Sequence, residues 1–209
     1  MKVGKENAEE LLSMLDKRIF CGKYMDEILG RGNRDSVIMS LNALVLLQRT
    51  LDAAGVCPIG HELKRSENGR PYFDGLKALD FSISHSESAV ACALSADGEG
   101  NVGVDVERVD GQRDTERFAK RFFSENERAA LEAAEDTERS WTRIWTKKEA
   151  YIKYLGGSPV RLSELDTEDA DEVRFDSTFF TLDGGAEYCL TLCRGVGTDR
   201  KTVKIKELV

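Results

Sequence analysis

The sequence predicts an α+β protein built of two similar halves, each a helix packed on a small, mostly antiparallel sheet. Its 209 residues suffice for one large domain or two small ones. A strong helical pattern occurs twice, at residues 34–51 and 141–155, and strand-like segments follow each helix. We therefore expect an N-terminal half, residues 1–100, and a C-terminal half, residues 101–209.

The first half is organised around the helix at 34–51, where apolar residues recur at every third and fourth position. Gly55 and Pro58 predict its end. The strand at 89–94 is apolar on both faces, so we expect it to be central. The other elements expected here are a helix at 8–15, a turn at 68–71, and strands at 79–83 and 101–107 that complete a three-stranded meander.

The second half is organised around the helix at 141–155, with Gly156 and Gly157 at its end. Ser124 followed by Glu127 predicts a helix that begins with a capping box. The sequence Asp183-Gly184-Gly185 predicts a hairpin turn. The other elements expected are a helix at 115–122 and strands at 173–182, 186–193 and 201–205.

The composition indicates a soluble cytoplasmic protein. The net charge of −8 argues against a general nucleic-acid binder. The first ten residues are polar, which argues against a signal peptide, and we expect no membrane span. The five cysteines form no CxxC pair and have no histidine at zinc-ligand spacing. We interpret them as reduced thiols.

A strand at 101–107 would place two carboxylates on one face. Val102, Val104 and Val106 would then share the face that needs a core, while Asp105 and Glu107 lie opposite. Carboxylates about 7 Å apart repel each other unless a cation lies between them. We expect open space beside them at glycine 103, where a hard divalent cation such as Mg²⁺ and a substrate phosphate would fit. The alternative is the solvated face of an edge strand.

The helix at 141–155 carries charged residues within its apolar stripe. Lys148 and Glu149 interrupt the stripe, and Lys153 lies one turn beyond Glu149. An ordinary surface ion pair would explain them. Alternatively, Glu149 is a third carboxylate near the metal or a general base, and the two lysines neutralise phosphate.

Four further residues are candidates for anion contacts. His85 and Ser84 lie at the end of a predicted strand, Arg70 on a turn before a proline, and Arg34 at a helix start. A polar turn histidine and surface arginines are the simpler alternatives. No nucleophile motif accompanies His85, so a hydrolase triad is poorly supported.

Five short motifs, taken in their order along the chain, closely resemble those of the 4'-phosphopantetheinyl transferases. The resemblance is to the larger kind, which activates carrier domains of synthetases and synthases. The resemblance covers roughly residues 65–160, and the helix after Arg34 also fits. The family position matched by Arg70 usually holds lysine. The matching motifs are Arg70-Pro71, Phe81-Ser82-Ile83-Ser84-His85-Ser86, Gly103-Val104-Asp105-Val106-Glu107, Arg121-Phe122-Phe123-Ser124 and Trp145-Thr146-Lys147-Lys148-Glu149-Ala150-Tyr151-Ile152-Lys153.

The resemblance implies two halves related by a pseudo-twofold axis, with coenzyme A bound in the cleft between them. It implies a holo-[acyl-carrier-protein] synthase activity, in which the phosphopantetheine arm moves to a serine of an apo acyl or peptidyl carrier protein and adenosine 3',5'-bisphosphate is released. Mg²⁺ is the implied cofactor, and a monomer that binds neither nucleic acid nor membrane is expected. A non-catalytic coenzyme A or carrier-protein binding module and a metal-dependent phosphatase are the alternatives.

The resemblance also implies roles for individual residues. Asp105, Glu149 and Lys153 would be catalytic, and Glu149 could accept the serine proton directly or through water. The implied metal ligands are Asp105, Glu107 and Glu149, and the implied coenzyme A contacts are Arg34, Arg70, Ser84, His85, Lys148 and Lys153.

Overall fold

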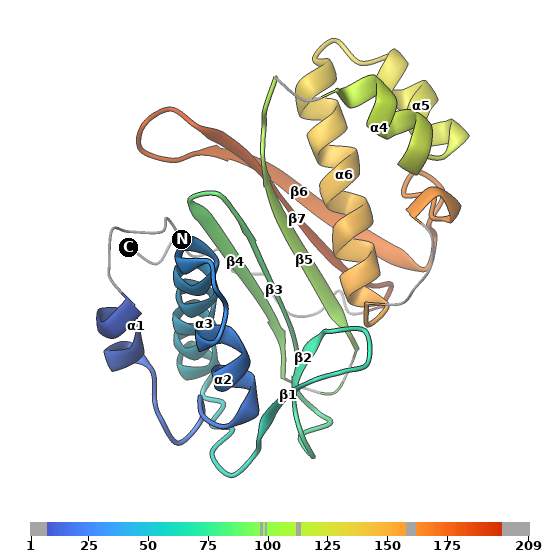
Figure 1. Cartoon of the computed structure of the whole chain (residues 1–209). Coiled ribbons are helices and arrows are strands. Elements are labelled where there is room, and N and C mark those ends of the chain that lie inside the picture. The colour runs from blue at the N-terminus through green and yellow to red at the C-terminus, as the bar shows by residue number, and fades with distance from the viewer. Residues whose placement is uncertain (1–7, 97, 99, 112–113, 158–161, 198–209) are drawn as a thin grey trace.

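The computed structural model describes residues 8–96, 98, 100–111, 114–157 and 162–197. Helices and small antiparallel sheets are combined, which confirms the predicted α+β class (Figure 1). The helices are α1 (Ala8–Met14), α2 (Lys23–Leu29), α3 (Arg34–Ala54), α4 (Thr115–Phe122), α5 (Glu125–Glu132), α6 (Thr137–Tyr154) and the 3₁₀ turn η1 (Leu162–Glu164). The strands are β1 (Leu63–Arg65), β2 (Pro71–Phe73), β3 (Asp80–Ser86), β4 (Ala89–Ser95), β5 (Val102–Arg108), β6 (Val173–Thr181) and β7 (Glu187–Gly195). The strand expected at 201–205 lies outside the described residues.

The helix α3 forms the core of the N-terminal part and matches the predicted helix. Asn33 caps it by accepting a hydrogen bond from the backbone N–H of Ser36, and Gly55 ends it in a left-handed conformation with φ of 69°. By length and composition alone α3 could cross a membrane, contrary to the prediction that no stretch could. Half of that window is buried in the fold, as in the core helix of a globular domain.

Strands β3 and β4 form an antiparallel hairpin that is longer than predicted. Ser86 pairs with Ala89, so only two residues make the turn where the sequence suggested a five-residue connection. The two-sided apolar character of β4 has a different cause from the one expected. Ala89 and Ala91 pack against the valines of β5, while Val90 packs against α3. Thus β4 is covered on both faces without being a central strand.

The predicted three-stranded meander is wrong. β5 pairs antiparallel with β7, which pairs with β6, in the sheet order β5–β7–β6. β5 also lies beside β3 (Figure 1), although the two strands belong to different sheets. The sequence of β5 is compatible with pairing to either β4 or β7. In the structure its valine face packs against β4, while its backbone pairs with β7.

Helix α6 packs against β5 and β7 (Figure 1). The valine face of β5 is buried as predicted, and so is much of the opposite face. Gly103 does not leave open space there. A Cβ atom at this residue would overlap the carbonyl oxygen of Ala150 and lie 2.6 Å from the backbone nitrogen of Tyr154. The missing side chain therefore brings the backbone of α6 directly onto β5.

Helices α4 and α5 cover the N-terminal part of α6 (Figure 1) through an aromatic cluster. Trp141 stacks on Trp145 with 5.4 Å between ring centroids, and Phe123 stacks on Trp141. The predicted capping box at α5 is confirmed, because Ser124 and Glu127 each accept a hydrogen bond from the other's backbone N–H. This cluster fixes the helix that carries the charged residues predicted to be functional.

Candidate active site

Side chains from three elements meet beside β5: Asp105 and Glu107 from β5 itself, Ser84 from β3, and Glu149 and Lys153 from α6. Because α6 has 3.6 residues per turn, Glu149 and Lys153 lie on one face of it. The close approach of α6 at Gly103 brings that face toward the carboxylates. The structure thus assembles most of the predicted residues.

Asp105 is the centre of this cluster. Its side chain is 8% exposed, and Oδ1 accepts hydrogen bonds from Ser84 Oγ at 2.7 Å and from Lys153 Nζ at 2.8 Å. Lys153 Nζ also donates to Ser84 Oγ at 2.8 Å and to the carbonyl of Val104 at 3.1 Å. Across the described part of the chain, the second oxygen, Oδ2, finds no hydrogen-bond partner although it is buried. A buried acceptor without a partner is costly, so a ligand or cation would stabilise it.

Glu107 and Glu149 lie within electrostatic range of Asp105. Glu107 Oε1 accepts a hydrogen bond from Ser86 Oγ at 3.0 Å. Burial raises the pKa of Glu149, and the negative charges of Asp105 and Glu107 raise it further, against the lowering effect of Lys153. The two acids of β5 are therefore close enough to Glu149 on α6 to oppose its ionisation.

These carboxylates do not form the predicted metal site by themselves. No group of three or more His, Cys, Asp and Glu side chains within the described ranges is arranged to hold a metal ion. The ammonium of Lys153 lies against Asp105 and supplies the positive charge that the prediction assigned to a divalent cation. The physical reason is that a buried carboxylate is stabilised by a nearby positive charge, which Lys153 supplies.

His85 lies next to the cluster, on the opposite face of β3 from Ser84. Desolvation lowers its pKa, and the positive charges of Lys153 and Arg31 lower it further, although part of the ring is exposed. Arg31 precedes α3, and its Nη1 donates to Ser40 Oγ at 2.7 Å. Arg31 was not among the predicted residues, because a lone arginine in an unassigned segment carries no recognisable pattern.

Arg70 has a structural role in place of the predicted one. Its Nη2 donates to Asp80 Oδ2 at 2.5 Å and to the carbonyls of Phe81 and Val102 at 3.0 and 2.9 Å. Its side chain is only 12% exposed. The guanidinium therefore joins the starts of β3 and β5, and is directed inward and not toward an anion at the surface.

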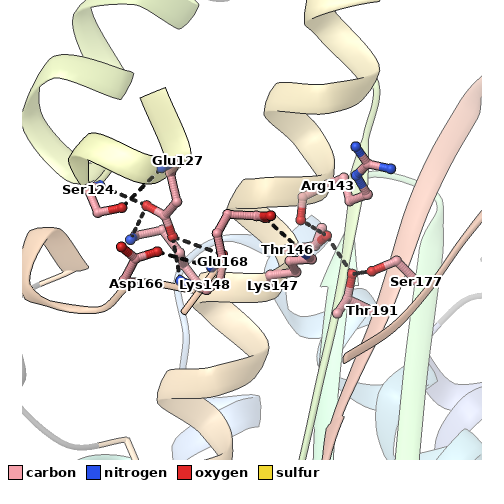
Figure 2. A network of polar contacts seen from close by, with 11 residues as sticks. Ser124, Glu127, Arg143, Thr146, Lys147, Lys148, Asp166, Glu168, Ser177 and Thr191 are labelled. Carbon is pink, nitrogen blue, oxygen red and sulfur yellow. Dashed lines mark hydrogen bonds and ion pairs between the residues drawn. The ribbon is translucent and has the colours of Figure 1, made fainter. Parts of the chain in front are cut away.

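Lys148 likewise does not face the carboxylates. Its side chain is fully buried, and Nζ donates to Glu127 Oε2 and to the carbonyl of Leu165, both at 2.5 Å (Figure 2). Glu127 Oε1 accepts hydrogen bonds from the backbone N–H and the hydroxyl of Thr167. Lys148 thus ties α6 to α5 and to the chain after η1, which corrects the predicted contact with pyrophosphate. On a helix, Lys148 and Glu149 point about 100° apart, so only one of them can face β5.

Arg34 is exposed at the first residue of α3. Its contact with a phosphate stays a prediction. Ser86 was missed by the sequence reasoning, which placed it in a turn. The signal that could have found it is the alternation of polar residues through residue 86, which extends the strand.

Comparison with known proteins points to one enzyme superfamily. A family model described as the 4'-phosphopantetheinyl transferase superfamily matches residues 101–200, which include β5 and α6. A 4'-phosphopantetheinyl transferase of Bacillus subtilis is 26% identical over 82% of this chain and 90% of its own length. The 4'-phosphopantetheinyl transferase AcpT of Salmonella typhimurium is 34% identical over 58% of this chain, which spans 63% of that protein.

A further relative comes from Saccharomyces cerevisiae. Its L-aminoadipate-semialdehyde dehydrogenase-phosphopantetheinyl transferase is 33% identical over 59% of this chain and 45% of its own length. Bacterial and yeast transferases are therefore both similar to more than half of this chain. Residues 101–200 thus match the 4'-phosphopantetheinyl transferase superfamily, and the relative from Bacillus subtilis extends the similarity to most of the chain.

Proposed function

We propose that this protein transfers the 4'-phosphopantetheine arm of coenzyme A to a serine of an apo acyl or peptidyl carrier protein and releases adenosine 3',5'-bisphosphate. The observation that carries the proposal is the convergence of Asp105 with Glu149 and Lys153 from α6. A diphosphate ester needs positive charge to bind and a base to activate the attacking alcohol. This cluster contains one lysine and three acids suited to those tasks.

The residues present fit a divalent cation such as Mg²⁺. Within the described residues the buried Asp105 Oδ2 has no hydrogen-bond partner, and two further carboxylates lie within electrostatic range. Oxygen ligands of this kind suit Mg²⁺, which completes its shell with substrate phosphate and water. Asp105, Glu107 and Glu149 would hold it. When bound, the ion would withdraw charge from the diphosphate of coenzyme A.

The two α6 residues would act on the two sides of the reacting phosphorus. Lys153 would move from Asp105 to the phosphate oxygens and stabilise the charge that develops on the leaving group. Glu149, with its raised pKa, would accept the proton of the carrier serine directly or through a water molecule. The serine oxygen then bonds to phosphorus as the bond to the bridging oxygen breaks, and no covalent enzyme intermediate is required.

We also propose that the two halves are related by a pseudo-twofold axis and that coenzyme A binds where they meet. The meeting of β3 from the first half with β5 and α6 from the second supports this location. His85 and Ser84, which lie on opposite faces of β3, would contact different phosphate groups of coenzyme A. A cytoplasmic monomer acting on carrier proteins is the setting we propose.

Mass spectrometry tests the proposed reaction. A panel of apo carrier proteins from fatty-acid, polyketide and nonribosomal-peptide systems is incubated with the protein, coenzyme A and Mg²⁺. We expect at least one carrier to gain a single phosphopantetheine. If no carrier gains mass while coenzyme A alone is cleaved to the bisphosphate, the protein is a phosphatase. If neither occurs, the protein is a binding module.

A further inference from the structure

Strands β3 and β5 are joined by side chains in place of a backbone ladder. The alternate residues of β3, all polar and on one face, each contact a β5 residue 21 or 22 positions later. Asp80 Oδ2 accepts from the N–H of Val102 at 2.8 Å, and Ser82 Oγ from the N–H of Val104 at 3.0 Å. This nearly constant offset means that the two strands run parallel.

The last two residues of the series, Ser84 and Ser86, each donate a hydrogen bond to a carboxylate of β5. Ser84 Oγ donates to Asp105 Oδ1 at 2.7 Å, and Ser86 Oγ donates to Glu107 Oε1 at 3.0 Å. Ser86 Oγ also accepts from the backbone N–H of Arg108 at 3.3 Å. Each of the two carboxylates of β5 therefore accepts one hydrogen bond from a serine hydroxyl of β3.

These serines are well suited to hold the carboxylates in place. Ser86 is 8% exposed and Ser82 is 4% exposed. Because Ser86 bonds both to a β5 backbone N–H and to the β5 carboxylate, its hydroxyl is fixed at two points. A glutamate has three side-chain torsions to restrain, whereas an aspartate has two, so Glu107 depends more on such a partner.

Resting on the proposed transferase function, we propose that Ser86 is a positioning residue that orients the carboxylate of Glu107 toward the cation held between β5 and α6. Ser86 does not touch the substrate or the cation. It donates a hydrogen bond to a residue that binds the cation. The loss of such a hydrogen-bond partner typically lowers metal affinity by about 10- to 100-fold. Ser82 provides the matched comparison, because its hydroxyl accepts a β5 backbone N–H but contacts no acid.

The test measures Mn²⁺ binding directly, by electron paramagnetic resonance of free Mn²⁺ in the presence of coenzyme A. We expect Ser86→Ala to weaken Mn²⁺ binding by about tenfold or more. Ser82→Ala should change the Mn²⁺ affinity by no more than about twofold. Its loss of thermal stability should be similar to that of Ser86→Ala. Ser86→Thr, which keeps the hydroxyl, should restore binding.

Two results would overturn the proposal. One is equal Mn²⁺ affinity in Ser86→Ala and Ser82→Ala, which would make Ser86 a structural residue only. The other is the absence of Mn²⁺ binding to the unaltered protein with coenzyme A. Failure of the transferase proposal looks different: Mn²⁺ binding would respond to Ser86 as expected while no carrier protein gained phosphopantetheine.

Discussion

Gly103 on β5 lies directly against Ala150 on α6, so closely that a Cβ atom at Gly103 would overlap the Ala150 carbonyl oxygen. This contact sets the distance between the strand that carries Asp105 and Glu107 and the helix that carries Glu149 and Lys153. The candidate site depends on that distance, because its acidic and basic groups come from both elements. A residue without a side chain is therefore a determinant of the site.

Gly103→Ala should damage both stability and transfer. The added methyl group must push α6 away, and overpacking of this kind costs about 1–3 kcal/mol. A shift of about 1 Å between reacting groups can lower the rate by about 100-fold. Denaturant unfolding and steady-state kinetics measure the two effects. Gly32→Ala is the control, because nothing lies within 4 Å of a Cβ there and its φ is not in the left-handed region. Unchanged kinetics in the Gly103 variant would contradict this account.

Lys148→Ala should destabilise the protein without weakening coenzyme A binding. The substitution leaves the carboxylate of Glu127 buried without its ionic partner, and breaking such a pair costs about 3–5 kcal/mol. The double variant Lys148→Met with Glu127→Gln should recover part of the stability. The measurements are the denaturation midpoint and the KM for coenzyme A at a temperature where each variant is folded. A raised KM with unaltered stability would support the ligand contact expected from the sequence.

Lys153→Met should strengthen Mn²⁺ binding in the absence of coenzyme A while lowering the transfer rate. Its ammonium lies 2.8 Å from Asp105 Oδ1 and competes with any cation for that carboxylate. We expect a gain of about tenfold, which corresponds to about 1.4 kcal/mol. Lys147→Met, which removes a lysine that pairs with Glu168, is the control. Unchanged or weaker Mn²⁺ binding in the Lys153 variant would show that this lysine does not occupy the cation position.

The stability of Glu149→Gln relative to the unaltered protein should increase with pH. Folding raises the pKa of Glu149, so its protonated form favours the folded state and its ionisation opposes folding. The contribution of Glu149 is fully present below its unfolded pKa of about 4.3. It is lost as the pH rises through the raised folded value, whereas glutamine does not titrate. Thermal unfolding of both proteins from pH 4 to pH 8 measures the difference. If the stability of the variant relative to the unaltered protein stays constant or decreases as the pH rises, the raised pKa is contradicted.

The elements with strong local patterns could be predicted from the sequence. The apolar spacing of α3, the capping box at Ser124 and the turn at Gly184 each depend on residues close together in the chain, and each is confirmed. The pairing of β5 could not be predicted, because β4 and β7 are both plausible neighbours and the choice depends on the packing of distant segments. The short α2, β1 and β2 carried too few residues for a pattern.

The site was predictable in its residue types more than in its geometry. Asp105 could be selected as one of two carboxylates on one strand face, and Lys153 because it lies one helical turn beyond Glu149; the structure brings the two together. Arg70 was selected on its turn before a proline and Lys148 within an apolar stripe, but their charges join elements inside the fold. A charged side chain within an apolar stripe of a helix indicates that it interacts with a partner. Whether that partner is a ligand or a buried acid such as Glu127 depends on tertiary packing.

A crystal structure with coenzyme A and Mn²⁺ tests the central claim most directly. The account predicts an anomalous Mn²⁺ peak at about 2.1 Å from oxygens of Asp105, Glu107 and Glu149, as expected for a small hard cation. Lys153 should then contact a phosphate oxygen and no longer Asp105. Bound coenzyme A with Lys153 still on Asp105, or Mn²⁺ located away from these three acids, would contradict it.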